Sequence, residues 1–276
     1  MSRYQGKTVV ITGAASGLGR GLAEEMAAHG ARVVVSDRNV SLAEEVVAGL
    51  TGRGLQACSQ ACDVRRQDEV EELFAQAETR FGPVDYAFAN AGFALAGMAH
   101  ELTPEHFHDL FEVNLMGVVR CCQAAYRRMR PRRSGHIVTT ASLAGLSGLP
   151  GMLPYSTSKA AVVRYSLDLR LEARPHGVKV TTLCPAFLST GIFSACRTVN
   201  LDIERLQGRL PLPISPLQPA VRALLRGIDR NLAVVTYPRH ATFLWWLNRI
   251  SPSLGQPLAE YLLKHILSAR REDSSS

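Results

Sequence analysis

Residues 9–19 read VVITGAASGLG, a short apolar run that leads directly into a glycine-rich turn. Such a run is typical of a buried strand, and residues 18–29 follow it with apolar positions at helical spacing. Glycine lets the backbone approach a ligand closely, and the free N–H groups at the start of a helix favour an anion. The stretch therefore predicts a strand, a tight turn and a helix that together hold the diphosphate of a dinucleotide.

The same alternation of short β-branched runs and helical spacing continues along most of the chain. Further strands are predicted at residues 32–36, 55–61, 84–89, 136–140 and 178–184. Helices are predicted between them at residues 42–50, 67–81, 104–129 and 155–174. Strand–helix–strand alternation implies right-handed crossovers. We therefore expect an α/β fold with a doubly wound, mostly parallel sheet, the Rossmann fold.

The pattern changes after Pro185. Residues 186–219 hold several prolines and glycines with little periodicity, which predicts a substrate lid. Beyond the lid we expect a helix at residues 217–229, a strand at 232–237 and apolar helical segments at 241–267. We expect residues 1–237 to form one catalytic domain, with residues 238–276 as its C-terminal helical extension.

The composition favours an ordinary globular protein, with 46% hydrophobic and 20% charged residues. The net charge of +7 raises the question of a polyanionic partner. Five arginines lie within residues 127–133, at the end of a predicted helix, where they complement its dipole. Zinc-finger spacing, an aromatic RNA-binding segment and a recognition-helix pattern are all missing from the sequence. We therefore expect no nucleic-acid partner.

The six cysteines form no CxxC pair, and no secretory signal precedes the strand that begins near Val9. We therefore expect reduced thiols and a cytoplasmic location. Glycine, proline and serine interrupt the longest charge-free stretch, residues 136–158, so no membrane-spanning helix is expected. No metal site is predicted.

Asp37 ends the second predicted strand, where an acid can bind the adenosine ribose of a dinucleotide. A carboxylate there accepts a hydrogen bond from a 2′-hydroxyl and repels a 2′-phosphate, so NAD is favoured over NADP. Two alternatives stay open. Arg38 could bind a 2′-phosphate instead, and Asp37 could cap the following helix.

Ser142 follows the strand at residues 136–140, and Tyr155 and Lys159 come one helical turn apart on one face. A tyrosine hydroxyl with a pKa near 10 is a poor general acid or base at neutral pH, and a nearby cation lowers that pKa. We expect Lys159 to activate Tyr155 in this way. The spacing alone would also fit a surface pair.

With these motifs in this order, roughly residues 5–237 resemble the short-chain dehydrogenase/reductase family. The TGxxxGxG segment runs from Thr12 to Gly19, and YxxxK corresponds to Tyr155 and Lys159. The remaining motif residues are Asp63 and Val64 after the third strand, Asn90, Ala91 and Gly92 after the fourth, and Asn114 on a helix.

The resemblance implies an NAD(P)-dependent oxidoreductase. Tyr155 would exchange a proton with the substrate oxygen, Ser142 would hydrogen-bond that oxygen, Lys159 would hold the nicotinamide ribose and Asn114 would position a water. The cofactor-binding residues that the resemblance implies are Gly13, Ser16, Gly17, Leu18, Gly19, Asp37, Arg38, Asp63, Val64, Asn90, Ala91, Gly92, Tyr155, Lys159, Pro185, Leu188 and Thr190.

Two positions depart from the family pattern. Ala89 replaces the first asparagine of NNAG, so the hydrogen bonds that tie the central strand to its neighbours must be lost or replaced. Ala186 replaces the glycine that usually follows the proline. Because alanine does not take positive φ without strain, we expect the nicotinamide loop to run slightly differently.

Residues expected to face the substrate are Phe93, Leu143, Leu149, Met152, Leu153, Phe187, Ile192 and Phe193. These segments place no arginine or lysine for a carboxylate or phosphate. We therefore expect an apolar alcohol, ketone or aldehyde of the steroid, retinoid, terpenoid, long-chain or aryl class. A non-catalytic dinucleotide-binding redox sensor or partner-binding protein is the alternative.

The tail carries Trp245 and Trp246, and then an apolar helical face formed by Leu254, Leu258, Tyr261, Leu262 and Ile266. Contact with a membrane surface is one reading of this pattern. We expect instead that the face is buried against the domain or a second subunit. Helices 104–129 and 155–174 resemble those that pair across a two-fold axis in the family, which implies a homodimer or homotetramer.

Overall fold

The computed structural model describes residues 3–189, 196–202, 205 and 214–268. Its main sheet has seven parallel strands in the order β3-β2-β1-β4-β6-β7-β9. The strands are β1 (Thr8–Thr12), β2 (Arg32–Asp37), β3 (Ala57–Ala61), β4 (Val84–Ala89), β6 (His136–Thr140), β7 (Lys179–Pro185) and β9 (Val234–Tyr237). The chain order reverses between β1 and β4, and such a switch point is where open parallel sheets bind ligands. The predicted doubly wound fold is confirmed.

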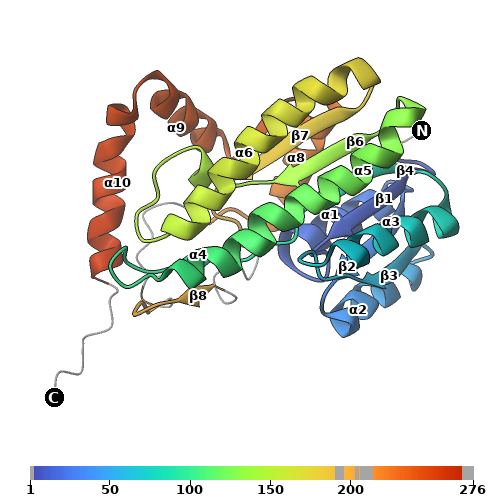
Figure 1. The fold of residues 1–276 in the computed structure, drawn as a ribbon, viewed down its shortest axis with the longest axis horizontal. Helices are drawn as coiled ribbons and strands as arrows, with labels where there is room; N and C mark the ends of the chain where they lie inside the picture. The colour runs from blue at the N-terminus through green and yellow to red at the C-terminus, as the bar shows by residue number, and fades with distance from the viewer. Residues whose placement is uncertain (1–2, 190–195, 203–204, 206–213, 269–276) are drawn as a thin grey trace.

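Helices cover both faces of this sheet (Figure 1). The α-helices of the described residues are α1 (Gly17–Ala28), α2 (Val40–Thr51), α3 (Gln67–Phe81), α4 (Pro104–Phe111), α5 (Val118–Arg132), α6 (Leu153–Ala173), α8 (Leu217–Asp229), α9 (Arg239–Ile250) and α10 (Pro252–Leu267). Helices α3, α5 and α6 pack on one face, and α1, α2 and α8 pack on the other.

The central strands are apolar on both faces because both are covered. Every residue of β1 is buried; Val10 packs with the α3, α5 and α6 layer, whereas Val9 and Ile11 pack with the α1, α2 and α8 layer. Near-continuous Val and Ile runs are what a two-sided parallel sheet requires. The core therefore consists of two apolar layers separated by the sheet.

The helix predicted at residues 104–129 differs from the structure in two ways: its interior is interrupted, and its end comes later than predicted. A six-residue π-helical segment, Glu112–Gly117, separates α4 from α5, and α5 continues through Pro131 to Arg132. Gly117 packs against Val64, since a Cβ at that glycine would lie 2.6 Å from Val64 Cγ2. Such π-helical segments occur frequently at functional sites. This one carries Asn114.

A second, two-stranded sheet was not predicted. Strand β5 (Leu95–Ala96) pairs in parallel with β8 (Arg197–Thr198). This pairing fixes part of the expected lid against the segment that follows β4. Two predicted strands are also shorter than expected, since β3 starts at Ala57 and β9 starts at Val234.

The expected helical segment at residues 241–267 forms two helices. Ser251 has extended backbone angles (φ −155°, ψ 128°) and ends α9 before Pro252 begins α10. The pair stands beside the sheet, with α10 at the left edge of Figure 1. Within the described residues, no helix has the length and apolar character needed to cross a membrane.

Candidate active site

A cavity of about 510 Å³ lies at the carboxyl ends of the central strands. Most of the predicted site residues line it: Gly13, Ser16, Gly17, Leu18, Gly19, Asp37, Arg38, Asp63, Val64, Asn90, Ala91, Gly92, Ser142, Tyr155, Lys159, Pro185 and Leu188. Thr190 lies outside the described residues, and Asn114 lies behind the cavity wall. The structure thus brings motifs from seven separate parts of the chain to one cavity.

The glycine-rich turn after β1 forms one end of the cavity. Gly13 and Gly17 have positive φ angles of 64° and 53°, which favour glycine. A Cβ on Gly13 would also lie 2.7 Å from Ala91 Cα, so the turn can pack against the segment after β4. Ser16 precedes α1 without a side-chain capping bond, which leaves the first N–H groups of the helix facing the cavity.

Asp37 holds this turn in place. Its Oδ2 accepts a hydrogen bond of 3.2 Å from the Ala15 amide, and its Oδ1 accepts one of 3.0 Å from the Asn39 amide. The side chain that caps α2 belongs to Asn39, which accepts from Leu42 N at 3.2 Å. Asp37 therefore does not cap α2. It lines the cavity beside the exposed Arg38.

Asp63 and Arg65 form the wall next to Asp37. The Arg65 guanidinium donates to both carboxylate oxygens of Asp63, with Nε at 3.0 and 2.9 Å. This pairing holds the pKa of the Asp63 carboxyl below its ordinary value. Both residues of the ion pair line the cavity, so the end of the cavity beside Asp37 is strongly polar.

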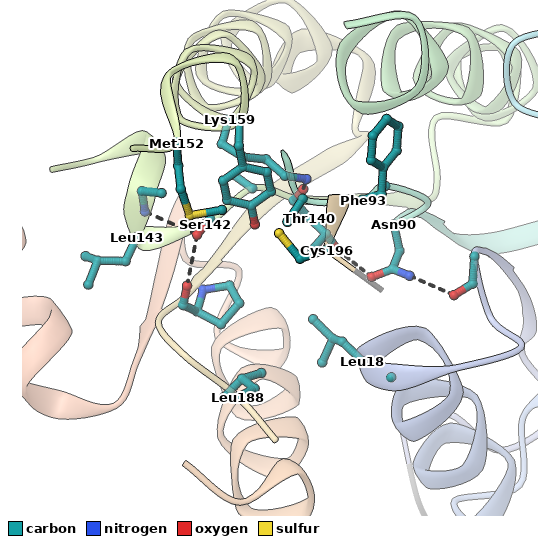
Figure 2. A pocket seen from close by; sticks show the side chains of 18 of the residues that line it. Leu18, Asn90, Phe93, Thr140, Ser142, Leu143, Met152, Lys159, Leu188 and Cys196 are labelled. Carbon is teal, nitrogen blue, oxygen red and sulfur yellow. Dashed lines mark hydrogen bonds between the residues drawn. The ribbon is translucent and has the colours of Figure 1, made fainter. Parts of the chain in front are cut away.

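The hydrogen bonds that Ala89 cannot make are supplied by its neighbours. Asn90 Nδ2 donates to the carbonyls of Thr12 and Gly13 at 3.0 and 3.1 Å, and its Oδ1 accepts from Thr140 Oγ1 at 3.0 Å. Figure 2 shows two of these hydrogen bonds of Asn90 beside the cavity. Asn90 thus ties β1, β4 and β6 together at their carboxyl ends.

Asn114 is fully buried in the π-helical segment. Its Oδ1 accepts from Phe93 N at 3.0 Å, and its Nδ2 donates to Phe93 O at 2.9 Å. A Cβ on Gly92 would lie 3.0 Å from Asn114 Oδ1 and 3.5 Å from Lys159 Nζ. Asn114 therefore positions residues 92–93 beside Lys159.

Ser142, Tyr155 and Lys159 all line the cavity, and Figure 2 shows Ser142 and Lys159 close together there. Ser142 Oγ accepts from Ala144 N at 3.1 Å, which begins a short 3-10 turn after β6. Lys159 Nζ donates to Thr140 O at 2.8 Å and lies 5.7 Å from the centre of the Tyr155 ring. All three side chains are held by α6 and the end of β6.

Burial determines the direction of two pKa shifts among these side chains. Burial raises the pKa of Tyr155 to about 12, while a hydrogen bond with Ser142 acts in the opposite direction. Burial also lowers the pKa of Lys159 to about 8, so the lysine is a weaker cation than assumed. The pKa of Tyr155 therefore lies above its ordinary value in the protein without bound ligand, because burial raises it, and activation of Tyr155 by Lys159 stays a prediction.

The predicted substrate-facing residues are mostly placed correctly. Phe93, Leu143, Leu149, Met152 and Phe187 line the cavity. Leu153 does not: its side chain is 41% exposed in the first turn of α6. Ile192 and Phe193 lie outside the described residues.

Ala186 needs no special backbone conformation. It is absent from the residues with positive φ in the described part of the chain, and its N–H donates to Tyr237 O at 2.8 Å. This bond extends the β7–β9 pairing by one residue. Alanine thus replaces glycine without strain, and Pro185, Ala186 and Leu188 all line the cavity.

Several cavity residues were missed from the sequence. Arg197 of β8 stacks on Phe93, with Cζ 4.5 Å from the ring centre, so a cation does reach the cavity. Cys196 is its neighbour. Arg65, next to the predicted Asp63 and Val64, was missed as well, and the helix pair adds Leu244 and Asn248 of α9 and Ala259 of α10. Only tertiary packing brings the residues of the helix pair to the site.

The tail face is divided between two environments. Leu258 and Leu262 line the cavity, and Leu262 and Ile266 are buried. Leu254 and Tyr261 are exposed, at 50% and 48%. The domain itself therefore buries only part of the face, and burial of Leu254 and Tyr261 against a second subunit stays a prediction. The two exposed residues lie on a flank of α10 that points away from the cavity.

Comparison with known proteins gives a consistent result. A family model described as short chain dehydrogenase matches residues 7–200. A 2,5-dichloro-2,5-cyclohexadiene-1,4-diol dehydrogenase of Sphingobium indicum is 36% identical over 206 residues, covering 74% of this chain and 81% of that protein. A 3-oxoacyl acyl-carrier-protein reductase of Synechocystis is 30% identical over 213 residues, covering 77% and 84%.

A solved structure shows the same arrangement of the chain. It is a short chain dehydrogenase/reductase from Burkholderia phymatum in complex with NAD, with a TM-score of 0.84 and 28% sequence identity. The similarity covers 92% of this chain and 96% of that chain, so it extends beyond the residues that the family model matches.

Proposed function

Since the chain belongs to the short-chain dehydrogenase family of oxidoreductases, we propose that it transfers a hydride between a nicotinamide cofactor and an apolar alcohol, ketone or aldehyde. The observation that carries this proposal is the single cavity that joins the glycine turn and Asp37 at one end to Ser142, Tyr155 and Lys159 at the other. A dinucleotide bound along this cavity would place its reactive ring beside the proton-transfer residues.

The residues at the end of the cavity formed by the glycine turn and Asp37 fit a nicotinamide dinucleotide. The N–H groups that begin α1 face the cavity and favour a diphosphate. Asp37 presents a carboxylate to the ribose, and Asp63 with Val64 lines the space for the adenine. We favour NAD over NADP because Asp37 would repel a 2′-phosphate, although Arg38 lies beside it.

The cofactor, when bound, supplies hydride transfer at C4 of its nicotinamide ring. The chain supplies the proton and the orientation. Tyr155 donates its hydroxyl proton to a carbonyl oxygen during reduction, or accepts the proton of the alcohol during oxidation. Ser142 donates a hydrogen bond to the same oxygen, and Lys159 orients the nicotinamide ribose with Nζ.

The lining at the end of the cavity that holds Ser142, Tyr155 and Lys159 supports the proposal of an apolar substrate. Leu149, Met152 and Phe187 line it together with Leu258 and Leu262 of the tail. Burial of apolar substrate surface against such a wall contributes roughly 25 cal/mol per Å². Arg197 and Asn248 are the polar groups that could orient a substrate there.

The same proposal extends to the domain boundaries, the oligomeric state and the cellular location. Residues 1–237 would form the catalytic domain, residues about 186–219 its substrate lid, and residues 238–276 its extension. A homodimer or homotetramer would form through α4 and α5, which follow one another along one line, and α6, which runs beside them (Figure 1). A cytoplasmic location accords with six free cysteines.

A redox sensor that binds the cofactor without turnover is the second candidate. The joint presence of Ser142, Tyr155, Lys159 and Asn114 favours an enzyme, because a sensor does not need groups that move protons. The test is a panel of apolar alcohols and ketones, offered with NAD(H) and with NADP(H), with absorbance of the reduced nicotinamide as the readout. Turnover of at least one compound is expected, and binding of cofactor without any turnover would favour the sensor.

A further inference from the structure

Helix α9 has an outer apolar face that the cavity does not use. Leu244 and Asn248 line the cavity on the inner side of the helix. Phe243, Trp246 and Ile250 recur at three- and four-residue spacing on another side, and they are 63%, 52% and 74% exposed. Leu254, at the start of α10, is also half exposed. We call these four exposed residues the outer face.

Two arginines accompany the outer face. Arg239 and Arg249 lie on α9, which contains no aspartate or glutamate, and the nearest acids in the sequence are Asp229 and Glu260. Arg239 precedes Phe243 by one helical turn, and Arg249 Cζ lies 5.8 Å from the centre of the Trp246 ring. An apolar face with tryptophan and flanking arginines is the composition of a helix that lies in a membrane interface.

We propose that the outer face docks on the surface of an anionic lipid membrane. Its aromatic and aliphatic side chains enter the headgroup region, and Arg239 and Arg249 bind lipid phosphates. Such a face would attach at the membrane surface, and the described residues contain no helix able to span the bilayer.

A second copy of the chain fits this face less well than lipid. A two-fold contact places the same patch on both sides of an interface. Arg239 and Arg249 of both copies would then lie in one interface, and α9 holds no acid to offset their repulsion. Anionic lipid phosphates, in contrast, are complementary in charge to the arginines beside the outer face.

Docking would place the cavity next to the lipid. One helix, about 10 Å across, separates the outer face from Leu244 and Asn248 on the cavity side. This arrangement would suit a substrate that partitions into membranes. The docking itself does not depend on the proposed reaction, and it is tested without turnover.

The chain contains two tryptophans, Trp245 and Trp246, so its tryptophan emission reports on α9 alone. The full-length protein is mixed with vesicles of phosphatidylcholine and phosphatidylglycerol, or of phosphatidylcholine only. Emission and co-sedimentation are measured for the parent and for three variants that keep both tryptophans. These are Phe243→Ser with Ile250→Ser, Arg239→Gln with Arg249→Gln, and Leu232→Ser as the matched control.

A blue shift and co-sedimentation with the phosphatidylglycerol vesicles are expected for the parent and for the control, whose exposed leucine lies outside the outer face. Each double variant should bind about tenfold more weakly while its thermal unfolding stays unchanged. Equal binding to both kinds of vesicle, or none to either, overturns the proposal. The proposal is also overturned if the parent binds no vesicles and instead forms an oligomer that the double variant Phe243→Ser, Ile250→Ser splits into monomers.

Discussion

Lys159 donates a hydrogen bond of 2.8 Å to the carbonyl oxygen of Thr140, the last residue of β6. This bond joins α6 to the carboxyl end of a central strand and fixes the ammonium group within the cavity wall. Because the side chain is almost completely buried, its charged form is destabilised, and its pKa falls to about 8. The position of Lys159 therefore links stability to pH.

We predict that Lys159→Met removes a rise in stability at alkaline pH. The pKa of Lys159 is about 8 in the folded protein and 10.5 ordinarily, so between these values the unfolded chain holds the proton and the folded chain does not. The contribution of Lys159 to the free energy of unfolding therefore rises with pH, by about 2 kcal/mol from roughly pH 8 to pH 10. Urea denaturation of the cofactor-free parent and variant measures this; equal pH dependence in both would contradict it.

We predict that Asn114→Ala lowers the free energy of unfolding by about 2–3 kcal/mol, because both hydrogen bonds to the Phe93 backbone are lost. Activity should fall as well, since residues 92–93 lose their support beside Lys159. Gln67→Ala, at an exposed position on α3, is the control and should change stability by less than about 0.5 kcal/mol. Equal stability of the two variants in urea would refute the structural role.

We predict that the parent prefers NAD(H), and that Asp37→Ala narrows or reverses this preference by removing a carboxylate that would repel a 2′-phosphate. The same change removes the hydrogen bond to the Ala15 amide, so affinity for both cofactors should fall somewhat. Arg38→Ala is the matched comparison and should weaken NADP(H) alone. Steady-state kinetics with each cofactor decide this. Faster turnover of the parent at low NADP(H) than at low NAD(H) would show that Arg38 dominates.

We predict that Leu258→Asn raises the KM for an apolar substrate about tenfold, because it puts an amide into the apolar cavity wall. Leu254→Asn, one turn earlier on α10, leaves that KM unchanged since its side chain is outside the cavity. Cofactor KM should be the same in both. If Leu258→Asn behaves like Leu254→Asn, the tail does not contact the substrate.

The fold and the polar end of the site could be predicted because their signals are local. Buried β-branched runs such as the one at Val9 and Val10 mark central strands, and parallel strands place their carboxyl ends at one edge. The glycine turn, Asp37 and the residues around Tyr155 follow such strands or the loops next to them. Their meeting in one cavity therefore follows from topology.

The apolar end could not be predicted because tertiary packing determines it. Leu254 and Leu258 have the same helical spacing, and only the seating of α10 decides which one lines the cavity. Arg197 reaches the site through a two-residue strand too short to give a pattern. Whether burial outweighs a nearby cation at Tyr155 likewise depends on the surrounding packing.

The most direct test of the proposed chemistry compares Tyr155→Phe with the parent. The substitution keeps the ring and removes only the hydroxyl, so cofactor affinity, measured by titration, should change less than about twofold. Turnover of an alcohol or ketone, followed by absorbance of the reduced nicotinamide, should fall by at least about 100-fold. Comparable turnover by the variant and the parent would contradict proton transfer by Tyr155.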